Sequence, residues 1–144
     1  MKVEISNGEL LDKVSILEIK KLNMTNADNL ANVEAEFLKL NPGVIDLFTK
    51  NGKEIKVLYL ELAKVNRILW DLENKVRSKG LNDKEFRKSS RMIFKYNEVR
   101  NQLKNDINII SGSDFKDVKE YRWNIYKILH GTFAMIKILI FVPM

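Results

Sequence analysis

Apolar residues recur every three or four positions along two stretches of the chain, residues 55–76 and residues 86–110. Positions three and four apart lie on one face of a helix, so each stretch predicts a long helix with one face that must be covered. The link between them, residues 78–82, is short and contains Gly80. Because a short link makes successive helices antiparallel neighbours, the pattern predicts a long antiparallel helical hairpin.

Two shorter helices are predicted before the hairpin. Ser6 and Glu9 have the spacing of a capping box at the start of the first helix, which covers about residues 8–23. This helix is apolar on two sides, so either it lies in the middle of the fold or its second face meets a partner. The second helix begins near Thr25 and is expected to end at residues 41–43 (Asn-Pro-Gly), because proline cannot continue helical hydrogen bonding.

The predicted fold class is all-α, with the hairpin packed against the two N-terminal helices. Short alternating patterns predict, in addition, a minimal β pairing of residues near 2–5 and 115–119. Residues 1–121 are expected to form the helical domain, and the apolar extension 122–144 to pack on it or at an oligomer contact. The apolar run 133–142 is too short to span a membrane, although contact of the extension with a membrane surface stays an alternative.

The composition excludes several kinds of chemistry. The 144 residues contain no cysteine and a single histidine, which removes disulfides, thiolate metal sites, cysteine nucleophiles and multi-histidine metal sites. No glycine-rich phosphate loop is present, and the chain start lacks the apolar run of a signal peptide, so a cytoplasmic location is expected. We therefore assign no catalytic residue, metal or cofactor, and expect a protein that is not an enzyme.

Positive charge is concentrated on the predicted hairpin. The formal net charge is +6; residues 1–52 are slightly acidic, and most of the excess falls within residues 53–110. Along the fourth predicted helix, basic residues recur at three- and four-residue spacing at Lys84, Arg87, Lys88, Arg91 and Lys95. Such a stripe can bind phosphates or nucleic acid, but it is also typical of a solvated helix face. No aromatic residues are expected to interleave it, which argues against stacking on single strands.

Polar residues interrupt the apolar faces of the hairpin. In an antiparallel pair that turns near Gly80, Asn66 is expected to face Asn97, and Glu61 to face Arg100. Polar groups of this kind fix the register of packed helices at some cost in stability, so these four residues are predicted to form a polar register layer. A polar pocket for a small ligand is the alternative.

One carboxylate pattern has a possible catalytic meaning. Glu9 and Asp12 match half of the paired motif with which helical nucleotide pyrophosphohydrolases bind magnesium. The second half would have to come from Asp71 and Glu73, which are two residues apart and diverge in direction on a helix. A magnesium-dependent nucleotide hydrolase is therefore the second alternative.

Three segments of the chain carry a resemblance: residues 4–20 (EISNGELLDKVSILEIK), residues 69–77 and residues 97–113. The first resembles the N-terminal motif of an uncharacterised family of short, mainly helical proteins from marine bacteria and their phages, and the other two are similar to two further stretches of that family. The resemblance covers about residues 2–121, and the sequence departs from the family after Tyr121. The family has no established activity, so the resemblance implies a source and no catalytic residues.

The leading functional hypothesis is a non-enzymatic interaction or assembly protein of helical-bundle type that forms a homo-oligomer. The first alternative is a phosphate- or nucleic-acid-binding accessory protein that uses the basic stripe.

Overall fold

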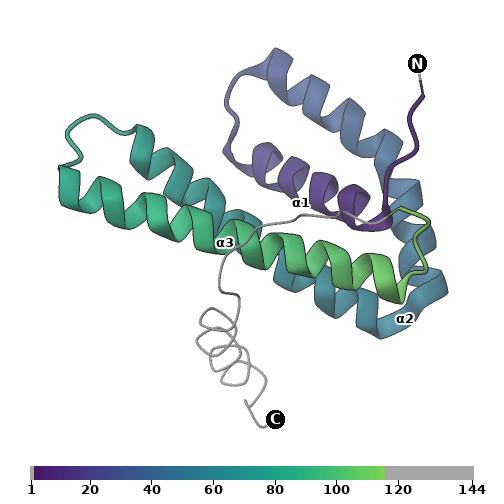
Figure 1. The fold of residues 1–144 in the computed structure, drawn as a ribbon. Coiled ribbons are helices and arrows are strands. Elements are labelled where there is room, and N and C mark those ends of the chain that lie inside the picture. The colour runs from purple at the N-terminus through teal and green to yellow at the C-terminus, as the bar shows by residue number, and fades with distance from the viewer. Residues whose placement is uncertain (1, 116–144) are drawn as a thin grey trace, which may run out of the picture.

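The computed structural model describes residues 2–115 of the chain (Figure 1). Three helices make up this part: α1 (Asn7–Asn23), α2 (Ala27–Arg77) and α3 (Asp83–Ile110). The all-α prediction is confirmed. Residues 2–5 do not form the predicted strand, and residues 116–119 lie outside the described part, as does the extension 122–144. No helix within residues 2–115 is long and apolar enough to cross a membrane.

Each helix begins after a side chain that accepts a hydrogen bond from the amide three residues further on. Ser6 does this at 3.2 Å, Asn26 at 3.0 Å and Asn82 at 2.9 Å. Such caps satisfy amides that have no partner in the first helical turn. Gly80 takes a φ of 88° in the link between α2 and α3, a conformation that costs glycine little. The predicted hairpin and its link are confirmed.

The predicted end of the second helix at residues 41–43 is wrong. Helix α2 continues through Pro42 and bends at Gly52, whose φ of 67° and ψ of −144° are not helical. The second and third predicted helices are therefore two arms of one bent element. Pro42 lies on the exposed side, while Val44 and Leu47 beyond it are buried, so their packing holds this segment helical despite the lost hydrogen bond.

Helix α1 lies between the first arm of α2 and the hairpin that the second arm forms with α3 (Figure 1). Leu11, Val14, Leu17 and Ile19 are all buried, which accounts for the two apolar sides of this helix within the fold itself. Leu22, which the spacing assigns to the core, is instead 82% exposed at the end of the helix.

The start of α1 is fixed to the end of α3 by close backbone contact. The Gly8 amide donates to Asn108 Oδ1 at 2.7 Å, and the Asn7 amide donates to Ser113 Oγ at 3.1 Å. Only half of the predicted capping box forms, because the Glu9 carboxylate does not return to the cap and pairs with the buried Lys104 at 2.6 Å. These contacts join the two ends of the described chain.

The core lies where α2 bends. Eight buried residues from all three helices meet there: Leu11, Val14, Val44, Leu47, Ile55, Tyr59, Leu62 and Ile107. The hydroxyl of Tyr59 donates to Glu18 at 2.7 Å, and burial together with this contact raises the pKa of the phenol, which keeps it neutral.

The far end of the hairpin extends beyond this core and beyond α1 (Figure 1). Between residues 70 and 100, Ser89 is the only buried residue. We call residues 75–95 the hairpin tip. It is a pair of helices without a third layer.

Candidate functional site

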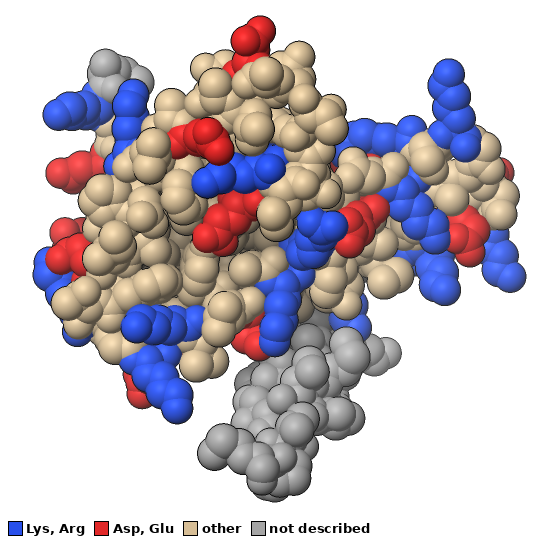
Figure 2. Space-filling view, turned by 180° about the vertical axis from the view of Figure 1, so that it is seen from behind, with Lys and Arg blue, Asp and Glu red and all other residues tan. Residues whose placement is uncertain are grey.

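The hairpin tip carries the whole net charge of the chain. Its 21 residues include eight basic and two acidic side chains, which leaves seventeen of each sign for the rest of the sequence. Figure 2 views the molecule from the side opposite to Figure 1. On the projecting end of the hairpin, it shows more Lys and Arg than Asp and Glu.

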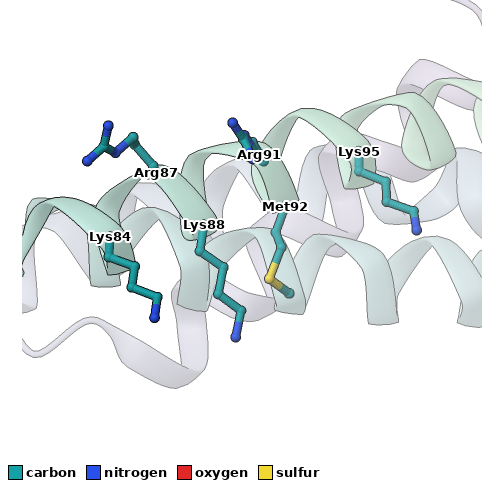
Figure 3. Close-up of a pocket in the computed structure, with 6 residues that line it drawn as sticks. All are labelled: Lys84, Arg87, Lys88, Arg91, Met92 and Lys95. Carbon is teal, nitrogen blue, oxygen red and sulfur yellow. The ribbon is translucent and has the colours of Figure 1, made fainter.

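The five basic residues predicted from the sequence share one open pocket of about 580 Å³ on α3. Figure 3 shows Lys84, Lys88 and Lys95 pointing to one side of the helix and Arg87 and Arg91 to the other. All five are exposed, and within residues 2–115 none forms an ion pair. The structure thus brings these side chains together on a single surface.

Two partly exposed aromatic residues lie within the hairpin tip, although neither lines the pocket that the five cations share. Phe86 is 48% exposed and Phe94 is 49% exposed. Phe86 begins the second apolar stretch, 86–110, whose face is expected to be covered, but near the link no third helix covers the hairpin. The tip therefore combines cations with partly accessible aromatic surface.

A second cluster of polar side chains lies deep in the fold, where α1 meets the hairpin. Asp12, only 1% exposed, accepts from Arg100 through Nε at 2.8 Å and also through Nη2. Asn66 donates to Asp12 at 2.8 Å and to Ser15 Oγ at 2.7 Å. We call Asp12, Ser15, Asn66 and Arg100 the polar junction. The hydrogen bond to Asp12 raises the pKa of the Arg100 guanidinium, although burial acts in the opposite direction, so this group stays charged.

The polar junction differs from the predicted register layer. Arg100 pairs with Asp12 on α1, while Glu61 pairs with its neighbour Lys64 at 2.8 Å, so the expected Glu61–Arg100 pair does not form. Asn66 also turns to α1, and Asn97 donates to the carbonyl oxygen of Ile93 on its own helix. The polar groups therefore tie α1 to the hairpin and do not join the two hairpin arms to each other.

Sequence reasoning missed Asp12 and Ser15 as members of this cluster. Both lie on the buried side of α1, three residues apart and next to Leu11 and Val14. A carboxylate and a hydroxyl inside an apolar helix face need buried partners, and that requirement was the available signal.

A pocket of about 270 Å³ opens beside the polar junction. Asn66, Asn97 and Arg100 line its polar side. Its apolar wall is made by Ile16, Ile19, Leu69 and Trp70, and Glu73 and Arg77 also line it.

The carboxylates considered for magnesium do not come together. On α1, Glu9 pairs with Lys104 and Asp12 pairs with Arg100. The other two candidates, both on α2, pair within that helix: Asp71 with Arg67 and Glu73 with Arg77. Among the described residues, no group of three or more acidic or histidine side chains is placed to hold a metal ion. The single histidine, His130, lies outside the described part.

A model for a family of unknown function, DUF6165, matches residues 1–130. The chain belongs to this family. The match ends nine residues beyond the domain boundary predicted at residue 121. Neither the curated proteins nor the solved structures include a match to the chain. The origin in marine bacteria or phages stays a prediction.

The three segments named above for the family resemblance meet at the polar junction and its pocket. Residues 4–20, 69–77 and 97–113 supply every residue of both except Asn66. The five cations of α3 lie outside these segments. The protein therefore presents two candidate sites, an exposed basic surface on α3 and an open pocket beside the polar junction.

Proposed function

We propose that the protein is a non-enzymatic interaction protein whose hairpin tip binds a polyanionic partner, with nucleic acid as the first candidate. The observation that carries this proposal is the location of the whole net positive charge on one projecting pair of helices. The five cations of α3 are exposed and have no ion-pair partner among the described residues.

Exposed cations without ion-pair partners suit phosphate binding for a physical reason. A cation held by a neighbouring carboxylate must give up that contact before it binds a phosphate. Lys84, Lys88 and Lys95 on one side of α3, with Arg87 and Arg91 on the other, can instead contact phosphates directly and release the counterions of the nucleic acid. The first amides of α3, next to the Asn82 cap, add a favourable helix N-terminus.

Binding to a labelled 20-base-pair DNA duplex, followed by fluorescence anisotropy, tests this proposal. The variant Lys84→Gln/Arg87→Gln/Lys88→Gln/Arg91→Gln is expected to bind at least tenfold more weakly at 100 mM salt. With roughly five phosphate contacts, the log–log salt slope of the unchanged protein should be about −4.5, and the variant should flatten it by about 3.6. A single-stranded RNA of equal length measures the contribution of Phe86 and Phe94.

The matched control removes the same four charges from outside the tip, as Lys2→Gln/Lys20→Gln/Lys39→Gln/Lys53→Gln. Both variants then have the same formal net charge. An equal loss of DNA affinity in the two variants would mean that the overall charge of the protein, and not the hairpin tip, governs binding. Absence of binding at 50 mM salt, or binding that does not depend on salt, would contradict the proposal.

We also propose self-association, which rests on a different observation. Large apolar side chains are exposed on both arms of α2: Leu38 and Ile45 are seven residues apart on the first arm, and Val57 and Leu60 are three apart on the second. Such spacings place each pair on one helix face, where a second copy can cover it. Sedimentation equilibrium is expected to give a mass above 16.8 kDa that returns to this value in Val57→Lys/Leu60→Lys. A monomer at all concentrations would exclude this assembly. A cytoplasmic location remains part of the proposal.

A further inference from the structure

We propose that the pocket beside the polar junction binds a small carboxylic acid with an apolar body. This site shares only Arg77 with the hairpin tip and none of the five cations of α3, so the proposal does not depend on nucleic-acid binding. It rests on an oriented guanidinium with one free donor group and on an apolar wall beside it.

Arg100 is fixed in position before any ligand arrives. Its Nε and Nη2 groups donate to the buried Asp12, so one edge of the planar guanidinium is held. The Nη1 group has no partner among the described residues, and the side chain, 28% exposed, lines the pocket. A guanidinium presents donors in a geometry that matches a carboxylate, and an oriented one loses little conformational freedom on binding.

The wall next to Arg100 is apolar and comes from two helices. Ile16 and Ile19 reach it from α1, and Leu69 and Trp70 reach it from α2. Burying the apolar part of a ligand against these side chains contributes a favourable free energy of about 25 cal/mol for each Å² removed from water. A ligand that carries a carboxylate at one end and a hydrocarbon or ring at the other uses both surfaces.

The free donor in the pocket favours an anion over a cation. Arg77 is paired with Glu73 and Arg100 with Asp12, so an anion would be bound by the remaining Nη1 donor of Arg100 and not by an excess of positive charge. Asp12 is not among the lining residues, because it is enclosed behind Arg100. The side-chain amide of Asn66 donates to Asp12 and to Ser15. Asn66 therefore has no free amide hydrogen to donate to a ligand, and Arg100 supplies the donor.

Isothermal titration calorimetry of the full chain with three probes of similar shape tests this site. 3-Phenylpropionate has the carboxylate, 3-phenylpropionamide is its neutral analogue, and phenethylamine carries a positive charge. We expect saturable binding of the carboxylate, at least tenfold tighter than that of the amide, and the weakest binding for the amine. Equal affinity for the carboxylate and the amide, or no binding of the carboxylate at millimolar concentration, would overturn the proposal.

Two variants locate the binding. Ile16→Phe adds volume to the apolar wall while both members of the Asp12–Arg100 pair stay in the sequence, and it should weaken binding of the carboxylate at least tenfold. Leu22→Phe, exposed on the same helix, should leave this affinity unchanged. If Ile16→Phe does not fold, Arg77→Gln takes its place, with an expected loss of several-fold. Arg67→Gln is its control, because Arg67 forms a similar exposed pair on α2 but does not line the pocket. Unchanged affinity in the folded pocket variant would place the probe elsewhere and exclude this site.

Discussion

Replacing Asp12 by alanine is expected to lower the free energy of unfolding by about 3–5 kcal/mol, the range observed when one partner of a buried ion pair is removed. Asp12 is the only carboxylate paired with Arg100 in the described part, so the guanidinium would remain largely buried without a counter-charge. Asn66 would lose its carboxylate acceptor at the same time. Chemical denaturation followed by circular dichroism measures this loss.

An exposed pair provides the control for Asp12→Ala. Asp46 contacts Lys50 one turn away on α2, and both side chains are more than half exposed. Asp46→Ala should therefore lower the free energy of unfolding by no more than about 0.5 kcal/mol. The double variant Asp12→Leu/Arg100→Met should recover much of the loss, because well-packed apolar groups replace a buried ion pair at little net cost. A loss below about 1 kcal/mol for Asp12→Ala would show that water reaches Arg100 freely.

Replacing Gly8 by alanine is the second substitution with a large expected effect. A Cβ atom at this position would lie 2.9 Å from Asn108 Oδ1 and closer still to the backbone carbonyl oxygen of Lys104. The backbone of α3 cannot move aside as a side chain can, so the helices must separate and the Gly8–Asn108 hydrogen bond weakens. Overpacking and the weakened bond together should cost about 2–4 kcal/mol, measured by the same denaturation experiment.

Gly43→Ala is the matched control, because this position is also helical. The added Cβ would lie 3.0 Å from Cδ2 of Leu10, the flexible end of a side chain that can shift. Alanine is favoured over glycine in a helix by up to about 1 kcal/mol, so the net change should be near zero. A loss at Gly43 as large as that at Gly8 would indicate a general intolerance of the helices to added volume and not a specific close approach of α1 to α3.

The parts of the fold that sequence predicted are those determined locally. Three- and four-residue spacing located the hairpin, and Ser6 and Gly80 marked helix ends, because caps and links act within a few residues. The helix end predicted at Pro42 was wrong, because the packing of Val44 and Leu47 in the core outweighs the tendency of proline to end a helix. Local signals are reliable only where tertiary contacts do not oppose them.

Of the two candidate sites, only the basic surface on α3 could be predicted from local spacing. The five cations of α3 recur at three- and four-residue spacing along a single helix, so the spacing alone was enough to group them. The polar junction joins Asp12 to Arg100 across 88 positions, and the spacing rules used for the hairpin did not connect α1 to it. Asn66 and Arg100 were identified as unusual, but their partners were sought within the hairpin.

The hairpin tip, with two helices and no third layer, has a consequence for dynamics. Amide hydrogens there can exchange with solvent when the two helices open locally, because few buried contacts oppose that opening. Near Ile107, where α3 passes through the core, exchange requires the whole domain to unfold. One helix therefore spans both a labile end and a stable end, so a partner that orders the tip would slow its exchange while leaving the global stability near Ile107 almost unchanged.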